Sequence, residues 1–197
     1  MNNKYLIAIA AGACLAMSGQ FAVAKGPNYT YAEAGYTHTD GDLVDGDGAS
    51  VNISYGATDH IFVKLGYTFQ NVDFKMAPGG ADADRFQLGL GGHMAVTDNI
   101  DAVAAVSFVD VEFTNTGGLG NTNEDGFLAE VGVRAMVTKE VELNATVSGL
   151  HLGGDDDTGY GVGAVYKLKK RWSATGSYRQ FTDDDEGEFF IGLRFRL

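Results

Sequence analysis

Apolar and polar residues alternate along most of this chain with a period of two. In one clear run, Val63, Leu65 and Tyr67 interleave with Lys64 and Gly66. A strand with one apolar face has this period, whereas an amphipathic helix would repeat its apolar positions every three to four residues. The pattern therefore predicts an all-β protein.

The alternation comes in runs of about eleven residues separated by turn-forming residues. We predict ten strands, at residues 29–38, 48–57, 61–72, 84–96, 100–113, 126–138, 141–152, 158–168, 172–181 and 187–197. The run at 101–113 is apolar on both parities, so the pattern does not decide which of its faces is which.

The connections between these strands alternate in length. Those after even-numbered strands are tight, whereas 39–47, 73–83 and 114–125 after odd-numbered strands are longer and acidic. Short turns on one side and longer loops on the other are typical of outer-membrane barrels. We therefore predict a closed antiparallel up-and-down transmembrane β-barrel of about ten strands, with eight as the alternative.

The polar face of these strands carries unusually many glycines, and glycine accounts for 28 of the 197 residues. A soluble sandwich would coat that face with long polar side chains, whereas the crowded interior of a barrel needs small residues beside long ones. The apolar face carries aromatic residues near strand ends, which suits the two membrane interfaces. Both features favour a barrel with its apolar face in lipid.

The N-terminus is typical of a secretory signal peptide at residues 1–24. Lys4 is followed by an apolar run, and Ala22 and Ala24 form a small-x-small cleavage site. We expect cleavage near Ala24, which leaves residues 25–197 as the barrel. An alternative is a lipoprotein leader with Cys14 as the lipidated residue.

Composition excludes several classes of protein. The net charge of −12 disfavours binding to nucleic-acid phosphates, and a single cysteine cannot form an intrachain disulfide. No apolar run of about 20 residues follows residue 24, so membrane-spanning helices are not expected.

With these features, the chain resembles the small single-domain outer-membrane β-barrels, such as OmpX and the barrel of OmpA. The phrases that carry the resemblance are YAEAGY (31–36), TDHIFVKLGYTF (58–69), TDNIDAV (97–103), VGVRAMVTKEVEL (131–143) and FFIGLRFRL (189–197). The resemblance implies a location in the bacterial outer membrane and recognition of the last strand by the barrel-assembly machinery. The chain departs from that family by ending in Leu197 instead of phenylalanine, and by its ten predicted strands against eight.

Charged residues on the polar face are predicted to meet inside the barrel. Buried charges need partners or water, so they must form either a plug-like network or the lining of a narrow pore. Their excess of cations would make such a pore anion-preferring. The predicted lumen network comprises Glu33, Lys64, Arg85, Glu130, Arg134, Glu142, Lys167, Arg179 and Arg194.

The predicted outer loops are rich in carboxylates, and none of them has the ligand spacing of an EF-hand. We interpret them as solvated loops that face lipopolysaccharide, and an adhesin that acts through these loops is the alternative function. His38 and His151 lie near acidic residues without the spacing of a known catalytic set, so we expect no enzyme, no cofactor and no bound metal. The sequence thus predicts a monomeric barrel with a structural or narrow-pore role.

Overall fold

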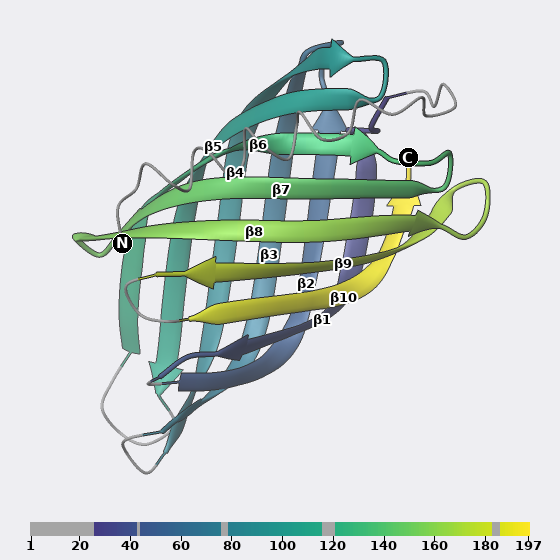
Figure 1. Cartoon of the computed structure of the whole chain (residues 1–197). Helices are drawn as coiled ribbons and strands as arrows, with labels where there is room; N and C mark the ends of the chain where they lie inside the picture. The colour runs from purple at the N-terminus through teal and green to yellow at the C-terminus, as the bar shows by residue number, and fades with distance from the viewer. Residues whose placement is uncertain (1–25, 43, 76–78, 116–120, 183–185) are drawn as a thin grey trace.

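The structure is a computed structural model that describes residues 26–42, 44–75, 79–115, 121–182 and 186–197. The described residues form ten antiparallel strands that close into one barrel (Figure 1). The strands are β1 (Tyr31–Asp40), β2 (Val44–Gly56), β3 (Ile61–Phe74), β4 (Gly80–Thr97), β5 (Ile100–Asn115), β6 (Asn121–Met136), β7 (Val141–Leu152), β8 (Asp155–Lys167), β9 (Trp172–Phe181) and β10 (Gly187–Arg196). The predicted signal peptide and its cleavage site lie outside the described residues.

Each strand pairs with its neighbours in sequence, and β1 closes the barrel by pairing with β10. In that closing ladder Glu33 stands opposite Arg194, and Gly35 stands opposite Gly192. Closure leaves the sheet without a free edge strand, a necessity for any sheet that lies in lipid. The predicted ten-strand up-and-down barrel is confirmed, and the eight-strand alternative is wrong. The described residues contain no helix long and apolar enough to cross a membrane.

The two ends of the barrel differ. One end holds both ends of the described chain and the connections that follow β2, β4, β6 and β8. We call it the periplasmic end and the opposite end the outer end, following the orientation expected of an outer-membrane barrel.

The predicted long loops at the outer end are wrong, because most of their residues belong to strands. β4 begins at Gly80, β5 reaches Asn115, and β6 begins at Asn121. The strand bounds leave at most five residues for any connection at this end. The segment 121–125 extends its ladder by backbone pairing, although it lacks apolar alternation and so gives no strand signal in the sequence.

The connection between β7 and β8 is a two-residue turn at Gly153 and Gly154. Their φ values are +61° and +102°, and hairpin turns that need positive φ at both positions select glycine. The turn places Asp156 opposite His151, within β8 and not in a loop. The predicted acidic loop at this position is therefore part of a strand.

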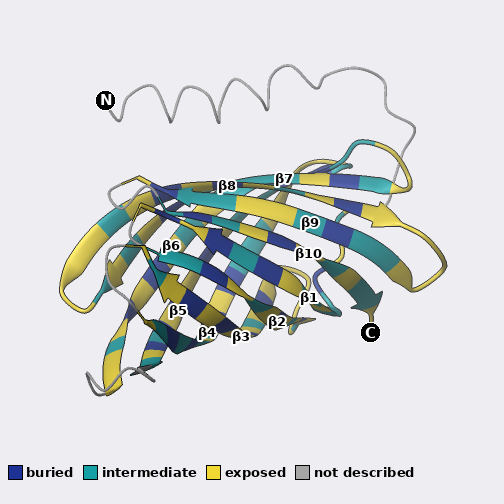
Figure 2. Ribbon diagram, turned by 90° about the horizontal axis from the view of Figure 1, so that it is seen from below, coloured by how far each residue is buried: buried dark blue, intermediate teal, exposed yellow. Residues whose placement is uncertain are grey.

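Side chains alternate between the outside of the barrel and its lumen, and the exposed and less exposed residues alternate along the strands in Figure 2. On β3, Val63, Leu65 and Tyr67 are exposed outside, whereas Phe62 and Thr68 are buried inside. The outside carries the predicted aromatic residues, all of them exposed by 40% or more except Phe195: Tyr36, Tyr67, Phe69, Tyr160, Tyr166, Trp172 and Tyr178.

The orientation of β5 follows from burial. Asp101, Ala105, Ser107 and Val109 are buried, whereas Val106 is more than half exposed. The odd-numbered residues of β5 therefore face the lumen. With Val111 and Leu128, which are also buried, Val109 forms an apolar patch on one wall of the lumen.

Candidate functional site: the lumen

A network of two ion pairs that share one carboxylate crosses the middle of the lumen. Glu130 of β6 binds Lys64 of β3 and Arg179 of β9, and its contact with Arg179 joins Oε1 to Nη2 at 2.8 Å. These strands are three positions apart around the barrel, so the contacts run across the lumen and not along its wall. We call this group the central brace.

A second pair crosses the lumen between β4 and β10. Arg85 Nη2 donates a 2.8 Å hydrogen bond to Glu188 Oε1, and Arg85 Nη1 lies 2.6 Å from Glu188 Oε2. The sequence prediction missed Glu188. Glu188 lies six residues before Arg194 on the same strand, so the alternation of side chains places both on the lumen face, and this could have identified Glu188 from the sequence.

A third group lies nearer the periplasmic end. Arg134 binds Glu142 with an Nη2–Oε1 distance of 2.6 Å, and Arg194 binds Glu33 with an Nε–Oε2 distance of 2.9 Å. Arg194 also lies 3.8 Å above the ring of Tyr31, and its Nη1 is 3.9 Å from Glu142 Oε1. These contacts connect β10 with β1 on one side and with β7 on the other.

The segment 26–30 reaches across the periplasmic mouth of the barrel. Ser54 Oγ donates a hydrogen bond to the Tyr29 carbonyl at 2.8 Å, and Arg134 Nη2 donates to the Asn28 carbonyl at 3.0 Å. Because Ser54 and Arg134 belong to β2 and β6, these bonds tie the segment to both sides of the mouth. The prediction that residue 29 lies in the first strand is wrong, since β1 begins at Tyr31.

Tyr29 anchors this segment inside the lumen. Its ring is 7% exposed, stacks on His93 with centroids 3.7 Å apart, and lies 5.2 Å from the ring of Phe62. Its hydroxyl donates a 2.9 Å hydrogen bond to Asp101, and the guanidinium of Arg134 lies 4.3 Å from the ring centre. Residues of four strands thus hold one side chain of the N-terminal segment.

Glycines make room for these bulky groups. A Cβ atom at Gly91 would lie 2.2 Å from the ring of Phe62, and one at Gly192 would lie 2.8 Å from the ring of Phe190. Small residues opposite large ones are needed to fill a narrow barrel, which explains the glycine-rich polar face of the sequence.

The described part of the barrel encloses a central cavity and a second cavity at one mouth. The first, of about 280 Å³, is lined by residues of all three ion-pair groups, and the second, of about 400 Å³, lies at the periplasmic mouth. Tyr31 and Arg194 line both cavities, so these two side chains stand at the boundary between them.

The charged residues that form ion pairs inside the described part of the lumen are balanced in number. Five cations (Lys64, Arg85, Arg134, Arg179 and Arg194) meet five carboxylates (Glu33, Asp101, Glu130, Glu142 and Glu188). The cationic surplus that the sequence predicts is therefore not found among these pairs, because Asp101 and Glu188 were not counted, whereas Lys167 and Arg196 add cations at the periplasmic mouth. Lys167, the ninth predicted residue, lies exposed at the periplasmic mouth and joins none of the described ion pairs.

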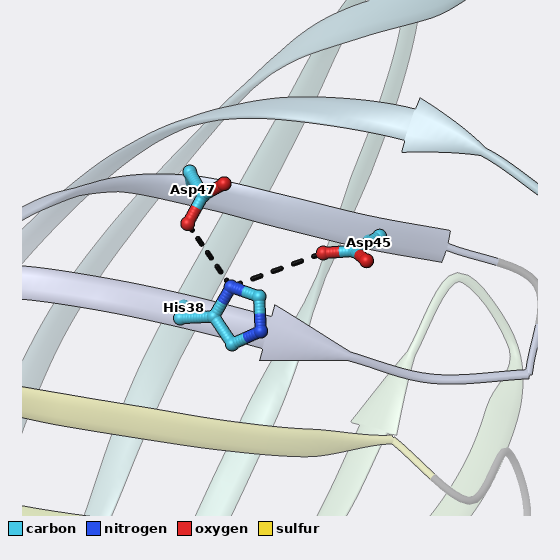
Figure 3. A group of neighbouring side chains, drawn as sticks. All are labelled: His38, Asp45 and Asp47. Carbon is cyan, nitrogen blue, oxygen red and sulfur yellow. Dashed lines mark hydrogen bonds and ion pairs between the residues drawn. The ribbon is translucent and has the colours of Figure 1, made fainter.

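A separate cluster lies on the outside of the barrel near the outer end (Figure 3). His38 Nδ1 is 3.0 Å from Asp47 Oδ1 and 3.8 Å from Asp45 Oδ1, and Tyr36 donates a hydrogen bond to Asp47. One ligand atom from each of His38, Asp45 and Asp47 falls within 4.8 Å of the others, a spacing that a metal ion can bridge. His38 thus contacts both carboxylates.

Comparisons with known proteins support an outer-membrane barrel. Residues 25–186 match the family of Gram-negative porins, and a comparison with curated proteins finds no match. An outer membrane channel from Pseudomonas putida F1 is similar in structure, with a TM-score of 0.55 and 10% identity over 84% of this chain and 93% of that one.

Two further solved structures are similar. The NanC porin has a TM-score of 0.53 and 10% identity, over 84% of this chain and 100% of that one. The translocator domain of the autotransporter NalP from Neisseria meningitidis has a TM-score of 0.50 and 11% identity, over 98% of this chain and 95% of that one. At such low identity these structures support the fold alone. The family match covers most of the chain, so this outer-membrane barrel belongs to the Gram-negative porins.

Proposed function

We propose that the protein is a narrow, weakly conducting channel for water and small hydrophilic solutes across the outer membrane. The observation that carries this proposal is the pair of cavities inside the lumen, which meet at Tyr31 and Arg194. A barrel with a purely structural role would fill this volume with side chains, whereas an aqueous path needs a polar lining that compensates its own charges.

The ion pairs limit the width of the proposed path. The central brace and the Arg85–Glu188 pair both cross the lumen, so a solute has to pass between paired side chains. Because the lumen charges balance, we expect weak ion selectivity in the middle of the barrel. The segment anchored by Tyr29 narrows the periplasmic mouth further.

Other expectations remain predictions. These are a monomer without catalysis, cleavage of the leader near Ala24, contact with lipopolysaccharide, assembly through the C-terminal strand, and the finer likeness to OmpX and the OmpA barrel. The adhesin alternative gains no support from the outer end, where the strand bounds leave at most five residues for any connection.

Single-channel recording of purified, refolded protein in planar bilayers tests the proposal. We expect small current steps for the unmodified protein and larger steps for Tyr29→Ala, which removes the anchor of the segment across the mouth. Tyr166→Ala is the matched control, because Tyr166 is an exposed tyrosine on the outside of β8. The absence of current steps from both the unmodified protein and Tyr29→Ala would contradict a channel function.

A further inference from the structure

The cavity at the periplasmic mouth, which we call the periplasmic vestibule, has a strongly cationic lining. It is formed by side chains that point inward from the strands, by the turns that follow β6 and β8, and by residues 26–28. Besides Arg194, the cations that line it are Lys139, Lys167, Lys170, Arg171 and Arg196.

The carboxylates of the periplasmic vestibule do not neutralise these five cations. Glu142 is bound by Arg134, and Glu140, the other carboxylate of the lining, offsets at most one of the five charges. Arg194 is held by Glu33. Among the described residues, none of the other five cations forms an ion pair with a carboxylate.

Two of these cations are held in place by other contacts. Arg196 Nη2 donates a 3.2 Å hydrogen bond to the Lys170 carbonyl, which ties the end of β10 to the turn after β8. The guanidinium of Arg171 lies 5.9 Å from the centre of the Phe195 ring. The Arg196 guanidinium is therefore held at the mouth without being neutralised, whereas that of Arg171 lies against an outward-facing ring at the rim of the vestibule.

We propose that the periplasmic vestibule is a binding site for small multivalent anions that carry phosphate or carboxylate groups. Several uncompensated cations around a concave cavity with low-dielectric protein walls concentrate their field in it and attract anions. Arginine forks bind phosphate and carboxylate oxygens in bidentate geometry, and lysines add point charges. The cavity of about 400 Å³ has room for such a small anion.

The ligand enters from the aqueous periplasm, because the vestibule opens inside the ring of strands. Phospholipid headgroups carry the same phosphate chemistry, but they lie outside that ring. The vestibule shares Tyr31 and Arg194 with the central cavity, so a bound anion also obstructs the path from the periplasmic side. This obstruction, unlike the binding itself, rests on the proposed channel function.

Isothermal titration of inorganic pyrophosphate into the refolded protein in phosphatidylcholine nanodiscs tests the binding. We expect saturable binding that weakens about fivefold in Lys167→Gln and in Lys170→Gln, as each variant removes one charged contact from a hydrated site. Lys169→Gln is the matched control, because Lys169 belongs to the same turn without lining the cavity. The proposal is overturned if binding does not saturate, or if Lys169→Gln lowers the affinity for pyrophosphate as much as the two test variants do.

Two further measurements separate the source of the phosphate and the consequence for transport. Phosphatidylglycerol in the nanodiscs should leave the affinity for pyrophosphate unchanged, and competition by this lipid would show a headgroup site in place of the proposed one. Pyrophosphate added to the periplasmic side of a bilayer should reduce the current of the unmodified protein more than that of Lys167→Gln. If the protein binds pyrophosphate and never conducts, the binding site stands and the channel function fails.

Discussion

The centre of the lumen and the outer rim both contain a lysine paired with a carboxylate, in different surroundings. Lys64 binds Glu130, whose side chain is 10% exposed and also binds Arg179. Lys75 binds Asp40 with a 2.6 Å contact, and the two side chains are 39% and 67% exposed. The lumen pair connects opposite walls of the barrel, whereas the rim pair lies in solvent.

This difference teaches where charges must be compensated. Charges in a confined lumen lose part of their hydration, and each charged residue of the central brace has a partner of opposite sign. Charges at either end keep their water, so one sign can accumulate: carboxylates at the outer end and cations around the periplasmic vestibule. The net charge of −12 therefore does not describe the lumen.

A charged substitution on the lipid-facing side of the barrel should cause the largest loss of stability, because a charge there has neither partner nor water. Leu88 is exposed on the outside of β4, and Leu88→Arg should lower the free energy of unfolding by about 2–4 kcal/mol. Gln87→Arg, one residue away on the lumen side, should cost much less. Urea unfolding in lipid vesicles, followed by the fluorescence of the single tryptophan, Trp172, measures both. Equal losses would contradict the assigned facing of β4.

The central brace gives the next largest effect. Glu130→Gln leaves Lys64 and Arg179 without their carboxylate, and we expect a loss of about 2 kcal/mol, below the roughly 3–5 kcal/mol of a dry interior because lumen water hydrates the cations. The same unfolding measurement applies, and the current steps should become larger and more anion-selective. The control is Glu112→Gln, which removes an exposed carboxylate from the outside of β5. No difference between the two variants would mean that the brace does not stabilise the barrel.

The strands and their facing were predictable, because alternation directly reflects a sheet with one face in lipid. Most partners in the lumen were not. Glu130 binds residues 66 and 49 positions away in sequence, a pairing that depends on barrel closure and on the stagger of the strands. Tyr29 was assigned to a strand because it directly precedes the alternating run, and its turn into the lumen depends on contacts with four distant strands.

The outer extensions of the strands were missed for another physical reason. Segments such as 121–125 contain only polar residues, and they are strands because their backbones pair with the neighbouring ladder. Alternation of apolar and polar residues reflects burial of one face of a strand, so it cannot identify the outer end of a hairpin in which both faces are polar.

We expect the smallest change in stability when the lysine at the rim is replaced. The hydrogen bond to Asp40 and the charge of that carboxylate raise the pKa of Lys75, yet the pair is exposed and screened by salt. Lys75→Met should therefore leave the urea midpoint unchanged, whereas Lys64→Met should lower it, although less than Glu130→Gln because Glu130 keeps Arg179. Repeating the titrations at about 1 M salt should leave the loss caused by Lys64→Met unchanged, because the partner of Lys64 is sheltered in the lumen. If Lys75→Met destabilised the barrel as much as Lys64→Met, the position of a lysine in lumen or rim would not decide its contribution to stability.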